Sequence, residues 1–355
     1  MKPPSQRIRR VFLLSASAAT VGAMVLAGVT SSAVAAQSGP LAGVSHSDHR
    51  GPGYPPPGGI YTPFTNCPLR NSLMQESVGG SATGCVAGDA TGGTITIGNI
   101  TTPVTHPVTV QFGIWDPPNA GSNQFTGGIL PPRAGLEAQL VSAPELVPGG
   151  LLKALGCPSS DPGVEKLCEK AADRGGRDLE VFAQAQSAGP ITNFGLVTWT
   201  QPLKFQLINP LLGDDCYIGS EDNPVVLNPS LTGTLVVEND PNPTAHPDTG
   251  VLEITNGAAT DTTFAAPGVT GCGPGGSANI AVDEAIDTSA GLPAASGSNS
   301  LTLTGTFSLA VCFAPANMAR ILLSAFKDSV GTPAPSAAAG IRMSAASLRG
   351  RFGIR

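Results

Sequence analysis

Residues 301–313 read LTLTGTFSLAVCF and carry the strongest structural pattern in this chain. The odd positions are apolar or glycine, from Leu301 through Phe307 to Phe313, and the even positions are mostly threonine, serine or alanine. Side chains of a β-strand alternate between its two faces, so the pattern predicts a strand with one face in the core and a polar opposite face. Gly305, in the middle, predicts a bulge or a bend.

Shorter segments of similar character lie before this strand. They are residues 94–97, 108–112, 136–141, 179–183, 203–207, 235–237 and 252–254. The prolines at 103 and 107 predict that the second segment is an edge strand or begins late, because proline lacks the N–H that a central strand donates. Glycine and proline together make up 78 of the 355 residues, which favours short strands joined by turns. We therefore predict an all-β fold of Gly/Pro-linked antiparallel strands, arranged as a sandwich or a barrel.

A helical insert at 157–178 interrupts the predicted β-rich domain, which we place at 63–315. Asp161 followed by Pro162 is typical of a helix start, and apolar residues recur at helical spacing from there to Ala171. Gly175 ends the helix. The segments SLTGTL (230–235) and TLTGTF (302–307) resemble each other, so two related subdomains and a coincidence both remain open.

The first 35 residues are typical of a signal peptide. A basic start precedes an apolar stretch, and Ala33–Val34–Ala35 fits the small-x-small cleavage rule. We predict cleavage after Ala35 rather than a membrane anchor, because Ser, Thr and Gly dilute the roughly 20 apolar residues that a span needs. Arg9 and Arg10 are compatible with twin-arginine export and equally with general secretion. We expect no transmembrane segment in the mature chain, and a secreted, extracellular location.

The two ends of the mature chain differ from its middle. Residues 36–62 lack a hydrophobic period and are rich in Gly and Pro, which predicts a flexible linker. Residues 316–355 predict a short helix followed by a disordered basic tail. Without the four basic residues of the signal, 15 Lys and Arg face 25 Asp and Glu, a formal charge of −10. So acidic a chain is expected to repel nucleic acid.

All seven cysteines lie beyond the predicted cleavage point: Cys67, Cys85, Cys157, Cys168, Cys216, Cys272 and Cys312. In an exported protein they are expected to be mostly oxidised, and the odd number leaves at least one free or paired between chains. Proximity in sequence predicts the bridges Cys67–Cys85 and Cys157–Cys168. No C-x-x-C is present and no Cys lies close to a His, which argues against a zinc site or a thioredoxin-like centre.

No catalytic motif stands out. There is no G-x-S-x-G, and the Ser324-x-x-Lys327 spacing lacks the companion signatures of enzymes that use it. His106 and His246 are the histidines of the predicted domain, and each precedes a proline. Either could act as a base with a distant acid, although exposed turn residues are the simpler interpretation.

Two acidic clusters are candidates for calcium, which is bound by six to eight oxygens. The first contains Asp214, Asp215, Glu221 and Asp222; the second contains Asp240, Asn242 and Asp248. Neither matches a known ligand spacing, so solvated turns are the alternative. Calcium is the one cofactor that the sequence suggests testing.

Several segments resemble a group of secreted actinobacterial proteins of unknown function. These are 64–68 (FTNCP), 107–111 (PVTVQ), 147–152 (VPGGLL), 209–220 (NPLLGDDCYIGS), 264–272 (FAAPGVTGC) and 291–297 (GLPAASG). The resemblance brings no activity, but it implies the pairs Cys67–Cys85 and Cys216–Cys272. The insert with Cys157 and Cys168, the basic tail and Cys312 depart from the group. The odd thiol would be Cys312, on the threonine-rich face of its strand.

Three functions are compatible with these features. The first is a non-catalytic extracellular or cell-surface protein, stabilised by disulfides, with a binding or structural role. Such a protein could associate with the cell wall, and the sequence does not identify its partners. The second is a hydrolase with a site assembled from loop residues. The third is a carrier of an apolar ligand. The lack of a catalytic motif favours the first over an enzyme.

Overall fold

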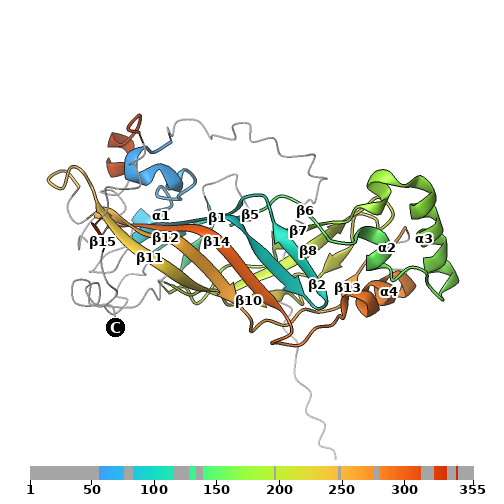
Figure 1. The fold of residues 1–355 in the computed structure, drawn as a ribbon. Helices are drawn as coiled ribbons and strands as arrows, with labels where there is room; N and C mark the ends of the chain where they lie inside the picture. The colour runs from blue at the N-terminus through green and yellow to red at the C-terminus, as the bar shows by residue number, and fades with distance from the viewer. Residues whose placement is uncertain are drawn as a thin grey trace, which may run out of the picture. The chain divides into compact units, whose positions relative to one another are not determined.

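The computed structural model describes residues 56–75, 83–115, 128–132, 139–195, 197–246, 249–274, 280–312, 324–333 and 341–342. The predicted signal peptide (1–35) and most of the predicted linker lie outside these ranges. Within them the strands form two antiparallel sheets, so the predicted all-β class, as a sandwich with a small helical insert, is confirmed (Figure 1).

The larger sheet has the order β15-β11-β12-β14-β1-β3-β4, with β2 also paired to β1 and β5 to β3. Its strands are β1 (Thr83–Ile97), β2 (Ile100–Val104), β3 (Val108–Ile114), β4 (Ile129–Leu130), β5 (Leu140–Val141), β11 (Ser230–Asn239), β12 (Thr249–Asp261), β14 (Ser300–Cys312) and β15 (Ile341–Arg342). β3 begins directly after Pro107, which is the late start expected from the sequence. Pro103 lies in β2, which pairs with β1 alone.

The smaller sheet has the order β13-β9-β8-β7-β6, with β10 also paired to β8. Its strands are β6 (Glu145–Leu146), β7 (Phe182–Ser187), β8 (Gln201–Ile208), β9 (Tyr217–Ile218), β10 (Val225–Leu227) and β13 (Val269–Thr270). In β8 every second residue is buried, as the alternation at 203–207 predicts. The segment at 179–183 is only partly a strand, because a 3-10 turn η2 (Gly176–Leu179) precedes β7.

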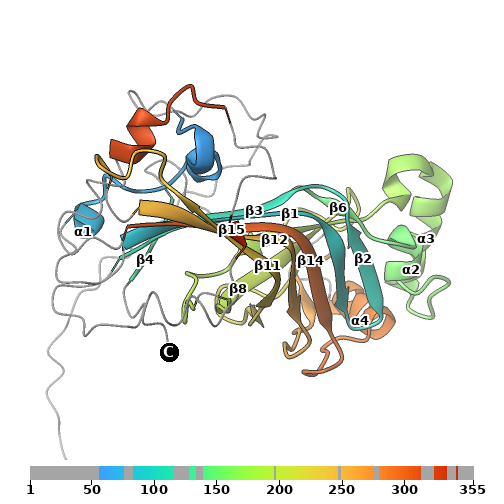
Figure 2. The same cartoon turned by 60° about the vertical axis from the view of Figure 1, so that its left-hand side comes forward.

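β14 lies at the centre of the larger sheet, between β1 and β12. Both neighbours shift register where they pass Gly305: β1 between Ala90 and Gly92, and β12 between Ile254 and Gly257. The bulge expected at Gly305 is therefore present in the partner strands. Extra residues in one strand of a pair increase local bending, and Figure 2 shows β12 and β14 curving together.

The outer face of β14 is polar only along its first half. Thr304 is exposed, but Ser308 and Ala310 are buried. They are covered by the 3-10 helix η1 (Gly59–Phe64), by α1 (Ser72–Gln75) and by a helical segment at 324–328, which form a second core cluster with β1 and β12. The prediction of a polar face throughout is thus wrong at this end, since distant segments supply an apolar cover.

The same cluster corrects the predicted linker and tail. Ordered structure begins by residue 56, and Tyr61 and Phe64 are buried against Phe326, with ring centroids 4.8 and 6.0 Å away. In the tail, Ile341–Arg342 pairs with Val237 and Val236 of β11 as β15. These parts of both segments are therefore structured, and the other tail residues beyond 333 lie outside the described ranges.

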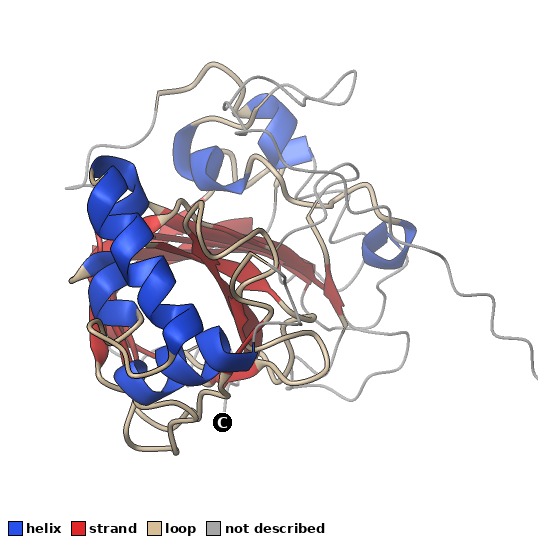
Figure 3. Cartoon of the chain, turned by 90° about the vertical axis from the view of Figure 1, so that its right-hand side faces the viewer, coloured by secondary structure: helices blue, strands red, loops and turns tan. Residues whose placement is uncertain are grey.

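Three helices lie together at one end of the strands, as Figure 3 shows: α2 (Gly150–Ala154), α3 (Pro162–Arg174) and α4 (Ile280–Ala290). α3 is the predicted insert. The carboxylate of Asp161 accepts hydrogen bonds from the N–H groups of Gly163 and Val164, which is N-capping. Neither α2 nor α4 was predicted from the sequence.

Candidate ligand-binding cavity

The space between the two sheets is not completely filled. A cavity of about 90 Å³ lies between β1, β2 and β14 on one side and β7 and β8 on the other. Its walls are mostly aliphatic and aromatic, with Ile95, Leu203, Phe205 and Leu301 among them. Two further apolar cavities, of about 70 and 50 Å³, share wall residues with the first.

Small side chains on the inner faces leave this space open. Ala183 and Ala185 of β7 line the cavity, and in the ladder they stand opposite Leu207 and Phe205 of β8. Ala259 of β12 lines it from the larger sheet. An engineered apolar cavity of about 150 Å³ accepts benzene. The main cavity is smaller than this, and only together with the two cavities that share its wall residues does the volume exceed it.

One side chain at the cavity wall has a donor group without a partner among the described residues. Gln201, the first residue of β8, is 4% exposed and lines both the main cavity and the adjoining 70 Å³ cavity. Its Oε1 accepts a hydrogen bond of 3.1 Å from Trp199 Nε1. Among the residues that the structure describes, Nε2 has no partner. A buried N–H group without a partner costs about 1–3 kcal/mol, so the position calls for an explanation.

Glu145 is the charged residue at the wall of the main cavity, and Asp89 lines the adjoining 70 Å³ cavity. Burial alone would raise the pKa of its carboxyl group, but hydrogen bonds from the Thr105 side chain and from the His106 and Thr105 backbone outweigh it and lower the pKa. The distances are 2.6 Å from Thr105 Oγ1, 2.8 Å from Thr105 N and 2.6 Å from His106 N. The carboxylate is therefore ionised at neutral pH.

Each of the two candidate catalytic histidines lies within hydrogen-bond distance of a carboxylate, as a hydrolase would require. His106 is exposed, and its Nδ1 lies 3.2 Å from Glu145 Oε2. Thr105 Oγ1 lies 3.3 Å from the same ring nitrogen, but its hydroxyl hydrogen is donated to Glu145 Oε2 at 2.6 Å and so is not available to His106.

His246 is buried, at 2% exposed, which corrects the expectation of an exposed turn residue. Its Nδ1 lies 3.0 Å from Asp240 Oδ1 and its Nε2 lies 3.0 Å from Asp328 Oδ2. Tyr61 Oη donates to the other oxygen of Asp240 at 2.6 Å. Because carboxylates occupy both ring nitrogens, this histidine cannot also accept a proton from a nucleophile. The cluster joins three chain segments and acts structurally.

The other proposed site residues are not gathered into a site. Ser324 and Lys327 are both exposed, with no hydrogen bond between them. Asp214, Asp215, Glu221 and Asp222 are exposed as well, and Glu221 contacts Lys204 at 3.4 Å. No group of three or more His, Cys, Asp or Glu placed to hold a metal occurs in the described ranges, so the geometry gives the calcium hypothesis no support. Asp248, of the second acidic cluster, lies outside those ranges.

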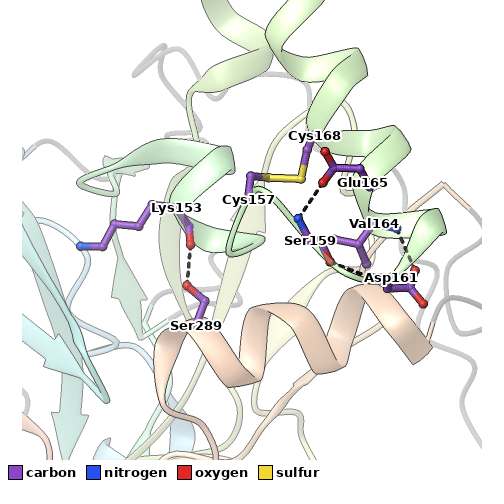
Figure 4. Close-up of a disulfide and its surroundings, with 8 residues drawn as sticks. All are labelled: Lys153, Cys157, Ser159, Asp161, Val164, Glu165, Cys168 and Ser289. Carbon is purple, nitrogen blue, oxygen red and sulfur yellow. Dashed lines mark hydrogen bonds between the residues drawn. A yellow bond between two sulfur atoms is a disulfide. The ribbon is translucent and has the colours of Figure 1, made fainter.

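Three disulfides join the cysteines in the pairs expected from the sequence and the resemblance: Cys67–Cys85, Cys157–Cys168 and Cys216–Cys272. Their Cα atoms lie 5.7, 5.9 and 4.2 Å apart. Figure 4 shows the second bridge tying the middle of α3 to the segment after α2, with Ser159 N donating to Glu165. Disulfides fit an oxidising compartment. The side chain of Cys312 lies outside the described residues, so its free thiol stays a prediction.

Comparison of the chain with protein-family models, with curated proteins and with solved structures finds no match. Within the described ranges, no helix has the length and apolar character needed to cross a bilayer.

Gln201, Glu145 and Trp199 distinguish this cavity, and none of them was predicted from the sequence as a site residue. One signal was available for Gln201, because it occupies the same strand phase as the buried Leu203, Phe205 and Leu207. A polar residue in an apolar phase marks either a satisfied core group or a binding group. Glu145 opens the two-residue strand β6 and Trp199 lies just before β8, so neither belongs to an alternating pattern that would give such a signal.

Proposed function

We propose that this protein binds a small apolar molecule between its two sheets and performs no chemistry on it. The observation that carries the proposal is the set of adjoining apolar cavities walled by strands of both sheets. Ligand sites are concave and mostly apolar, with few polar groups that orient the ligand. Gln201 and Glu145 fit that description here.

We further propose that the protein acts outside the cytoplasm. The predicted signal peptide and the resemblance to secreted actinobacterial proteins support export, and the three disulfides fit an oxidising compartment. An apolar ligand is poorly soluble there, so a carrier or a receptor would be useful. The hydrolase alternative is weaker, because the Thr105 hydroxyl beside His106 donates its hydrogen to Glu145 and both ring nitrogens of His246 face carboxylates.

The fluorescence of a tryptophan in the cavity wall can be used to measure ligand binding. Trp199 lines the cavity, and the other tryptophan, Trp115, packs in the cluster on the outer face of the sheet. In a Trp115→Phe background, titration with hexane or 2-hexanone is expected to change Trp199 fluorescence saturably. Organic extraction of protein purified from its secreted form, followed by mass spectrometry, is expected to yield a bound apolar compound.

A cavity-filling variant tests whether binding occurs in this space. Ala185→Leu places extra methyl groups in the cavity and is expected to weaken binding of both probes at least tenfold. Val226→Leu adds a methylene at an exposed position of β10 in the same sheet and serves as the matched control. Unchanged binding in Ala185→Leu, or no binding by the unfilled protein, would refute the proposal.

A further inference from the structure

The amide orientation of Gln201 is fixed by its neighbour. An indole Nε1–H can only donate, so the amide atom that faces it must be the oxygen. The NH₂ group is therefore the other branch of an amide whose side chain lines the cavity. A side chain that is 4% exposed, with one donor group unpaired among the described residues, is the arrangement expected of a group that awaits an acceptor from a ligand.

The charge at the same wall restricts what that acceptor can be. Glu145 is held ionised by Thr105 and His106. At this mostly apolar wall, a second negative charge on the ligand would be repelled by that carboxylate. A carboxylate or phosphate head group is therefore disfavoured, whereas a carbonyl or hydroxyl oxygen is not.

We propose that the ligand is an uncharged molecule with a slender hydrocarbon body and one carbonyl or hydroxyl oxygen, which accepts a hydrogen bond from Gln201 Nε2. This inference rests on the proposed function. It adds the chemical class of the ligand and makes Gln201 the residue that selects it.

Three probes of equal chain length test the inference: hexane, 2-hexanone and hexanoate, each titrated against Trp199 fluorescence in the Trp115→Phe background. The decisive quantity is the ratio of the Kd for hexane to the Kd for 2-hexanone, compared between the unmodified position 201 and its variants. The free energy of hydrating the free ketone is the same in each case, so it cancels from this comparison. Gln201→Met keeps the side-chain length and removes the amide. We expect this ratio to fall about tenfold, the value of one neutral hydrogen bond.

A second variant guards against misfolding of the first. Gln201→Leu also lacks the amide and places an apolar side chain of similar bulk at the same position, and it is expected to lose the preference for the ketone as well. Glu145→Gln is expected to strengthen hexanoate binding more than 2-hexanone binding, because it removes the repelling charge.

The outcomes separate this inference from the proposed function. If both neutral probes bind and their ratio is the same with and without the amide, the Gln201 amide does not contact the ligand, and only the inference fails. If hexanoate binds as tightly as 2-hexanone to the protein with Glu145 intact, the restriction to uncharged ligands fails. If no probe binds and organic extraction of the purified protein yields no apolar compound, the inference fails together with the proposed function.

Discussion

Gly305 of β14 lies directly opposite Gly257 of β12, at the position where β12 shifts its register. On its other side β12 pairs with β11, and the register of that pairing shifts between Thr232 and Thr234, where Gly233 lies. The resembling segments at 230–235 and 302–307 therefore place their glycines on either side of one bulge. This shared geometry gives the resemblance a structural reason that does not require two related subdomains.

Replacing Gly305 by alanine is expected to destabilise the fold. A Cβ there would overlap the carbonyl oxygen of Asp89 and lie 2.8 Å from Cα of Ala90. We expect a loss of about 2–3 kcal/mol in the free energy of unfolding, measured by urea denaturation. Gly92→Ala is the control, because its Cβ would meet only Thr304 Oγ1 at 3.4 Å, and its effect is expected to stay within about 0.5 kcal/mol. Equal losses in both variants would contradict this account.

Removal of the buried histidine is expected to cost stability and not ligand binding. His246→Ala leaves the buried carboxylate of Asp240 without one of its partners, so we expect a loss of about 2–4 kcal/mol in urea unfolding. The exposed His106→Ala is expected to lose less than about 1 kcal/mol. Both variants should retain 2-hexanone binding where folded. An ester-hydrolysing activity that disappears in either variant would instead support the hydrolase.

A glutamate pair gives the stability a defined pH dependence. Burial and the neighbouring charge of Glu238 raise the pKa of Glu253. The folded state thus holds this proton to higher pH than the unfolded state does, so stability falls as pH rises through the folded pKa. Glu253→Gln is expected to raise the Tm at pH 7 and to change it little at pH 4. Glu221→Gln, at an exposed side chain, is the control. A Tm gain that is equal at both pH values would rule out this explanation.

The longest disulfide loop is expected to contribute most to stability. Cys216 and Cys272 are 56 residues apart, whereas Cys157 and Cys168 are 11 apart. Loop-closure entropy predicts that the free energy of unfolding falls by about 4 kcal/mol when Cys216 and Cys272 are both replaced by serine. The corresponding loss for Cys157 and Cys168 is about 3 kcal/mol. Urea unfolding measures both, and the reverse order would contradict the entropic account.

Peptide mapping without reduction tests the remaining cysteine. We expect the three pairs that the structure shows and an alkylatable thiol at Cys312. A blocked Cys312 with a free thiol in another cysteine would show that the pairing is different.

Much of the local structure was predictable because it depends on neighbouring residues alone. Alternation of apolar and polar side chains placed β8 and β14, and the Asp161–Pro162 pair with Gly175 placed both ends of α3. α4 was not predicted. Its buried residues, Val282, Ile286 and Ala290, form a narrow stripe that stands out only once the helix is packed.

The sequence alone determined the strand pattern, the all-β class and the capped helix, because backbone geometry fixes which side chains share a face. Only the tertiary structure decided what covers each face. Ala310 is buried because Phe326 and Tyr61, far away in the chain, pack in the same cluster. His246 is buried because Asp328 and Asp240 converge on it, and Gln201 lines a cavity because small residues of another strand lie nearby. Periodicity carries no information about such partners, since they come together through long-range packing of segments whose separations in sequence vary freely.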